Sequence, residues 1–166
     1  MMFGLKALSP EAVPAAVSKA ERYRLLNEPW QAESICQDVL NVDPDNQHAL
    51  VILLLALTDQ FDDHTHIEEA KRLIPRLREE YDRSYYSGII CERRAKTALT
   101  HPHHGSEAVA YAWLRDAMQW YEKAEAVRPP ANDDALLRWN TCARLLMRNP
   151  HLQPSAEPDA EPIMSE

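Results

Sequence analysis

Glycine is scarce in this chain, with three residues among 166. Tight β-hairpin turns depend on glycine or asparagine, and half-buried strands show a regular alternation of apolar and polar residues. The longer stretches of this sequence lack that alternation and instead repeat apolar residues at helical spacing. We therefore expect an all-α fold of about seven helices.

Cysteine is rare as well. Cys36, Cys91 and Cys142 are far apart, and each lies within an apolar helical pattern. An odd and dispersed set is poor evidence for a disulfide framework or a zinc site. We expect three buried thiols that pack as small hydrophobic side chains, which suits a reducing cytoplasm.

Positive charge is in short supply: 18 Lys and Arg residues stand against 26 Asp and Glu residues, for a net charge of −8. Such a field disfavours binding to nucleic acid or to an anionic membrane surface. The apolar run 49–57 is far shorter than the ~20 residues that a membrane-spanning helix needs. Pro10 and Pro14 interrupt the alanine-rich start, so we expect no secretory signal there.

Motifs for catalysis are missing from the sequence. It has no glycine-rich phosphate loop, no dinucleotide-binding fingerprint and no recognisable nucleophile triad. We expect no enzymatic activity and no cofactor.

Two groups of histidines are the remaining chemical candidates. His101, His103 and His104 lie in the segment THPHHG, and His64 and His66 lie together upstream. Histidine clusters bind zinc or nickel, but no cysteine or carboxylate stands at ligand spacing beside THPHHG. A metal-binding histidine loop is therefore kept as the weakest alternative, and no residue is assigned as a metal ligand.

What the chain does contain is a repeated spacing of the form Ala-x3-apolar-x2-apolar-x4-Pro. It runs from Ala32 to Pro44 and again from Ala117 to Pro129, and a copy without the proline starts at Ala70. Steps of four and three place the apolar residues on one face of a helix, and the proline marks the end of that helix. Units of this kind bury their apolar faces by stacking on their neighbours.

Capping and proline signals divide the chain into expected helices over about 10–27, 29–42, 46–59, 65–82, 83–99, 106–128 and 133–148. Pro75 is expected to kink the fourth helix or to end its first segment. Residues 1–9 are an N-terminal extension, and residues 10–149 form one helical-repeat domain. Residues 150–166 are rich in Pro, Glu, Ser and Ala, which is typical of a disordered acidic tail.

The repeated spacings resemble the tetratricopeptide repeat, a helix-turn-helix unit of about 34 residues. The first unit covers about 13–46 and fits best. Ala20 and Ala32 stand at the small positions of its two helices, Tyr23 at the aromatic position of the first helix, and Pro44 at the closing proline.

The later units match less closely. The second starts near residue 47, with Leu54 at its small position, and the third has Gly88 at its small position. A long insertion then precedes Ala117 and Pro129, where the pattern resumes. The resemblance, which extends to bacterial proteins of this class, implies a right-handed superhelical stack of antiparallel helix pairs: about three repeats, with 133–148 as the capping helix.

Members of this family are interaction modules that bind peptides along the concave face made by the first helix of each repeat. The resemblance implies that this face is lined here by Val17, Glu21, Arg24, His48, Val51, Leu55, Asp59, Tyr85, Ile89, Glu92, Arg93, Asn140 and Arg144. Such a lining suits a peptide with an apolar anchor and a few charges. The family's chaperone-binding members hold a C-terminal carboxylate with lysine and asparagine, but Val17 and Glu21 stand at the first of those positions. We do not expect that partner.

A second interpretation of the charged residues stays open. Glu21, Arg24, Glu92 and Arg93 either contact a partner or form ion pairs within the scaffold. In the run Glu92-Arg93-Arg94, three successive side chains point in three directions around a helix, so at least one approaches the core and needs a partner of opposite charge.

The sequence thus predicts a cytoplasmic, non-enzymatic scaffold that binds a protein or peptide on its concave face. The alternative is a structural subunit that forms a homo-oligomer. It would associate through the third helix or through the aromatic residues near the C-terminus, which are Trp113, Trp120, Tyr121 and Trp139.

Overall fold

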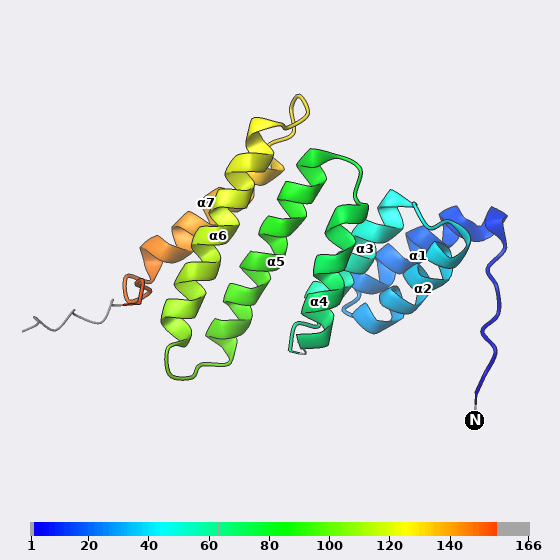
Figure 1. Ribbon diagram of the computed structural model, residues 1–166, viewed down its shortest axis with the longest axis horizontal. Coiled ribbons are helices and arrows are strands. Elements are labelled where there is room, and N and C mark those ends of the chain that lie inside the picture. Colours follow the sequence, from blue (N-terminus) through cyan, green and yellow to red (C-terminus); the bar gives the residue numbers. More distant parts are fainter. Residues whose placement is uncertain (1, 63, 156–166) are drawn as a thin grey trace, which may run out of the picture.

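The computed structural model describes residues 2–62 and 64–155. Within these residues the chain forms seven α-helices and two short 3-10 helices and contains no strand (Figure 1). The α-helices are α1 (Val13–Leu25), α2 (Pro29–Val42), α3 (Gln47–Thr58), α4 (His64–Leu73), α5 (Glu80–Thr100), α6 (Ser106–Ala126) and α7 (Asp134–Arg148), and the 3-10 helices are η1 (Pro10–Ala12) and η2 (Ile74–Arg76). The expected all-α class with seven helices is confirmed.

Helices that follow each other in sequence pack against each other. Figure 1 shows them in a row, from α1 and α2 at one end of the molecule to α6 and α7 at the other. Contacts join α1 to α2, α2 to α3, α3 to α4, α5 to α6 and α6 to α7, and α1 also reaches α3. The long helices α5 and α6 form the most extensive pair.

Local signals in the sequence set several helix ends. Asn46 caps α3, because its Oδ1 accepts a hydrogen bond from the Ala49 N–H at 2.9 Å. Asn27 follows α1 with a positive φ of 62°, a conformation that asparagine tolerates better than most residues. Pro75 acts as expected, since α4 ends at Leu73 and the proline lies in η2.

The expected start of the fifth helix was wrong. This helix, α5, begins at Glu80, so Tyr81 lies in its first turn and not at the end of α4. Arg83 lies inside the helix, and its Nη1 donates to the carbonyls of Leu77 at 2.8 Å and Arg78 at 2.6 Å. The guanidinium thereby satisfies acceptors in the turn before the helix, which local spacing could not indicate.

Ser106 does not cap the sixth helix. It is the first residue of α6, and its Oγ accepts a hydrogen bond from the His103 N–H at 3.2 Å. Gly105 takes the capping position with a φ of 82°, in the left-handed region that glycine enters without strain. His66 lies in α4 as expected, and α4 begins one residue earlier than expected, at His64.

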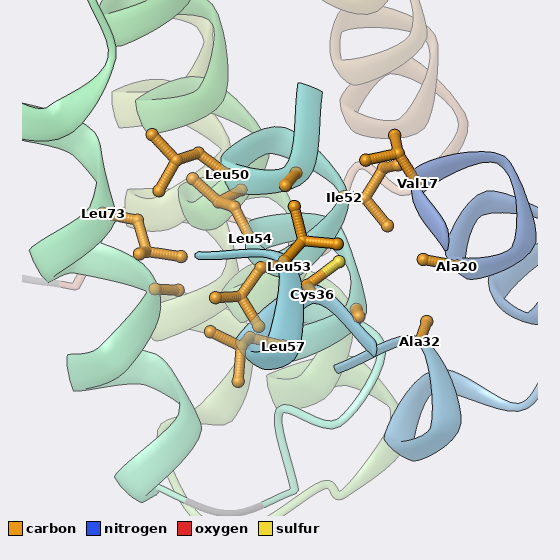
Figure 2. Packing of buried hydrophobic residues seen from close by; sticks show 14 of the residues in the cluster. Val17, Ala20, Ala32, Cys36, Leu50, Ile52, Leu53, Leu54, Leu57 and Leu73 are labelled. Carbon is orange, nitrogen blue, oxygen red and sulfur yellow. The ribbon is translucent and has the colours of Figure 1, made fainter. Parts of the chain in front are cut away.

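Buried apolar residues form two clusters. The first joins α1 to α4 and includes Ile90 of α5. Figure 2 shows its centre, where Leu50, Leu54 and Leu57 of α3 point toward neighbouring helices. The second joins α5 to α7 and includes Leu114, Tyr121 and Cys142. Leu55 and Tyr86 pack against both clusters. The core is therefore divided into two halves that meet at α3 and α5.

Small residues allow the helices to approach closely. Ala20, Ala32 and Ala117 have no exposed surface. A Cβ atom at Gly88 of α5 would lie 2.5 Å from Cε1 of Tyr121 in α6, so no larger residue fits there without movement of the ring. These three alanines are thus fully buried, and Gly88 lies at a tight contact between α5 and α6.

The packed chain extends beyond α7. Leu152 is buried in the second cluster, although the sequence placed it in the tail at 150–166. The acidic part of that tail, 156–166, lies outside the described residues, and so does Met1 of the N-terminal extension. All three cysteines are buried free thiols, as expected.

Candidate partner-binding face

Three charged residues join the first three odd-numbered helices on one face. Asp59, directly after α3, lies between Arg24 of α1 and Arg93 of α5. Its Oδ2 is 2.9 Å from Nε of Arg24, and its Oδ1 is 3.5 Å from an Nη of Arg93. All three were predicted from sequence as lining residues. The structure brings them together as one ion-pair network, with each side chain partly exposed.

A second pair links α1 and α3 nearer the start of α3. His48 Nε2 lies 3.5 Å from a carboxylate oxygen of Glu21, and both side chains are more than half exposed. An exposed pair of this kind is screened by solvent and contributes at most about 1 kcal/mol. The pair is informative about position, because it shows that Glu21 and His48, both predicted lining residues, lie on the same face as Arg24.

Glu92 of α5 is buried, with 1% of its side chain exposed. Its carboxylate accepts from Lys96 Nζ at 2.9 Å and Arg138 Nη1 at 3.0 Å. The hydroxyl of Tyr121 and the thiol of Cys142 also donate to it, at 3.3 and 3.4 Å. Four donors from three helices, α5, α6 and α7, therefore converge on one buried carboxylate.

Opposing effects act on the pKa of Glu92. Burial alone would raise this pKa, but the hydrogen bond and charge of Lys96 and the charge of Arg138 lower it below its ordinary value. The carboxylate consequently raises the pKa of the Cys142 thiol, which burial already raises, to about 12. Glu92 is thus an ionised group whose partners are fixed, which is the scaffold ion pair that the sequence left as an alternative.

Tyrosines continue the face toward the start of α5. Tyr85 stacks on Tyr81 with ring centroids 5.7 Å apart, and it meets Tyr86 edge-on at 5.0 Å. Tyr85 also borders a cavity of about 230 Å³ between α5 and α7, which Arg138 and Leu137 line from the other side. A half-buried aromatic ring beside a guanidinium can accept an apolar side chain with a neighbouring charge.

The other predicted residues divide by exposure. Val51 and Leu55 of α3 and Asn140 of α7 are half-buried, and Arg144 is exposed. Val17, Ile89 and Glu92 are buried, so their side chains support the face from within and cannot form its contact surface. This corrects their assignment as direct partner contacts.

Two residues of the face were missed in the sequence. Lys96 lies four residues after Glu92, a spacing that favours a helical ion pair and could have identified it. Arg138 reaches Glu92 from α7, 46 residues away in sequence, and no local signal indicates that pairing.

The opposite side of α5 has a different character. Arg94 lies over the ring of Trp113 of α6, 3.8 Å from the centroid. Trp113 and Trp120 line an apolar cavity of about 370 Å³ together with Ile74, Pro75 and Ile90. The run Glu92-Arg93-Arg94 therefore points in three directions as expected: into the core, toward Asp59 and onto an indole ring.

The histidine loop forms no evident metal centre. His101 Nε2 lies 2.9 Å from Oδ1 of Asp62, and His103 and His104 line a cavity of about 640 Å³ with His151. Over residues 2–62 and 65–155, no three His, Cys, Asp or Glu side chains are grouped so that they could hold a metal ion.

Comparison with other proteins gives no match to a protein-family model, to a curated protein or to a solved structure. Among the described helices, none combines the length and the apolar character needed to cross a bilayer.

Proposed function

We propose that this chain is a non-enzymatic scaffold of the tetratricopeptide-like class, a right-handed stack of helix pairs that binds a peptide or protein segment on the face shared by α1, α3, α5 and α7. The single observation that carries the proposal is the network Arg24–Asp59–Arg93. It places residues from three predicted first helices side by side on one partly exposed surface.

The packing of small residues supports the class of fold. Among the small residues identified from the repeat spacing, Ala20, Ala32 and Ala117 are fully buried, and Gly88 lies against the Tyr121 ring of α6. Stacked repeats need small side chains at these positions because the helix backbones approach closely there.

The chemistry of the face supports binding over catalysis. It combines half-buried apolar side chains, such as Val51 and Leu55, with a tyrosine and several guanidinium groups. Tyrosine and arginine are the residues that most often dominate binding energy at protein interfaces. The surface is therefore suited to hold an extended segment by an apolar anchor flanked by charges.

Selection from a random peptide library displayed on phage tests this function. Peptides selected on the wild-type chain are expected to lose at least tenfold in affinity when Arg24 is changed to glutamate, because the reversed charge removes one cation from the face. The matched control is Arg22→Glu, an exposed residue of the same helix α1. It should leave affinity within twofold.

Thermal unfolding by circular dichroism separates loss of binding from loss of fold. The proposal requires that the Arg24→Glu chain stay folded at the temperature of the binding assay. Selected peptides that bind both variants equally would place the binding surface elsewhere.

A self-associating subunit remains the second candidate, because one observation favours it. Leu25, Leu26 and Trp30 are clustered at the turn between α1 and α2 and are each more than 60% exposed. Most residues of the third helix, suggested from sequence as the interface, are buried, so the exposed cluster at the turn between α1 and α2 is the surface that this candidate rests on. A dimer that dissociates on Trp30→Ala, as seen by sedimentation equilibrium, would support this candidate.

A further inference from the structure

The partner-binding face carries more positive than negative charge, although the chain as a whole has a net charge of −8. We call its linked charges the basic strip: Arg24, Arg93, Lys96 and Arg138 as cations, with Asp59 and Glu92 as the carboxylates that join them. Four cations against two carboxylates leave the strip with a surplus of positive charge.

The cations of the strip are more exposed to solvent than its carboxylates. Lys96 and Arg138 are 43% and 35% exposed, while Glu92 beneath them is 1% exposed. Arg24 and Arg93 together carry about ten N–H donors, more than the single carboxylate of Asp59 can accept. The strip therefore has unused capacity to bind carboxylates.

Helix geometry keeps these charges on one surface. Glu92, Arg93 and Lys96 lie within about 100° around α5, because successive residues turn by about 100° and a step of four returns near the start. Arg93 leans toward Asp59 after α3, and Lys96 shares Glu92 with Arg138 of α7. Exposed carboxylates bound the strip, with Glu21 on α1 and Asp134 at the start of α7.

The chain itself contains a complementary segment. Residues 156–166 carry Glu157, Asp159, Glu161 and Glu166 and no positive charge. The segment begins directly after Ser155, which lines the same cavity as Leu99 near the end of α5. Lys96 lies three residues before Leu99, about 4.5 Å along the helix. Eleven residues reach roughly 36 Å when extended, so the strip lies within range.

We propose that the acidic segment 156–166 binds the basic strip of its own chain and so competes with an acidic partner segment for the same face. This inference rests on the proposed function for the face as a partner site. Leu152, four residues before the segment, is buried in the second cluster, so the tether between the packed chain and the segment is short. A short tether gives an effective concentration of about a millimolar, which makes even weak ionic contacts competitive.

A synthetic peptide tests the contact. The probe is a fluorescein-labelled peptide with the sequence of residues 156–166, and binding is followed by anisotropy. The two proteins are the full wild-type chain and the full chain with Glu157→Gln, Asp159→Asn, Glu161→Gln and Glu166→Gln. The neutralised chain should bind the peptide two- to tenfold more tightly, because its own segment no longer competes.

Added salt and a control peptide test whether the binding of the acidic peptide is electrostatic. Raising salt from about 50 mM to about 300 mM should weaken binding to the neutralised chain severalfold, since the Debye length shrinks. A peptide with the same acid-to-amide replacements should not bind. Equal affinity of the acidic peptide for both chains, or no binding to either, would overturn the proposal.

A further variant locates the contact. Lys96→Gln in the neutralised chain removes an exposed cation, while Arg138 still pairs with Glu92. Peptide affinity should fall at least threefold. Lys123→Gln is the control, because Lys123 lies on α6 over the Trp120 ring. Equal affinities of the two variants would place the peptide away from the strip.

Sedimentation equilibrium distinguishes binding within one chain from binding between chains. The wild-type chain should stay monomeric at low salt, whereas a salt-sensitive dimer that the neutralised chain does not form would overturn the contact within one chain.

The library selection separates the proposed partner function from the proposed binding of the acidic segment. If selected peptides bind the face and the tail peptide does not, only this inference fails. If the tail peptide binds and no selected peptide does, the partner function fails.

Discussion

At the scale of single residues, Glu92 best illustrates how this sequence joins structure to function. A buried carboxylate is costly unless it is paired and fully hydrogen-bonded. Here Lys96, Arg138, Tyr121 and Cys142 all donate to it. The same pairing holds two cations at the surface of the face, so one buried charge stabilises the helix packing and orients exposed donors.

Glu92→Gln should therefore lower the free energy of unfolding by about 1–3 kcal/mol at neutral pH, because the charge-assisted hydrogen bonds that Lys96, Arg138 and Tyr121 donate are weakened. The folded-state pKa of Glu92 lies below its ordinary value of 4.5, so the stability it contributes is present above that value and is lost as pH falls through the folded pKa. Urea unfolding of both chains from pH 7 to pH 3 should show their stabilities converging at low pH. A difference independent of pH would contradict an ionised Glu92.

At the scale of secondary-structure elements, a helix end can be predicted from the sequence where a residue close to that end determines it. Pro75 and Asn46 ended or started helices as the sequence predicted, because a missing N–H or a capping oxygen acts within a few residues. The start of α5 was missed because Arg83 satisfies the preceding carbonyls from inside the helix. Leu152 was assigned to the tail because burial by a distant cluster leaves no trace in local composition.

Asn46→Ala should lower the free energy of unfolding by about 1 kcal/mol, since the Ala49 N–H loses its acceptor at the first turn of α3. Ser9→Ala is the matched control, because Ser9 stands before η1 without a side-chain capping bond. Chemical unfolding followed by circular dichroism measures both. Equal losses for the two variants would mean that the Asn46 cap contributes nothing specific.

At the scale of the whole molecule, the candidate face depends on pairs of residues that are distant in sequence. Repeat spacing selected Arg24, Asp59 and Arg93 for one face, and the structure shows that these three residues are neighbours. Arg138 was missed because its partner lies one helix pair away, and spacing along a helix says nothing of contacts between helices. The repeat spacing also did not predict how deeply a side chain is buried. Val17 and Ile89 lie on the selected helices, but their side chains are inside the core.

The divided core leads to a prediction about cooperativity. Cys36 belongs to the first cluster and Cys142 to the second. Chiefly through burial, the pKa of each thiol is raised to about 12. Both thiols should therefore react slowly with a thiol reagent until the structure around them opens. Among the described residues, Leu55 and Tyr86 are the partly buried side chains that pack against both clusters. In stacked helical units, stability is a sum of local terms and contacts with nearest neighbours.

Leu54→Ala removes a fully buried side chain of the first cluster and should cost about 2–5 kcal/mol there. In native buffer, labelling of Cys36 should then accelerate at least tenfold more than labelling of Cys142. Leu114→Ala, an equally buried position in the second cluster, should reverse the order. Mass spectrometry of labelled peptides gives both rates from one sample. Equal acceleration of the two thiols in both variants would show one cooperative unit, because local opening of either half would then always carry the other half with it.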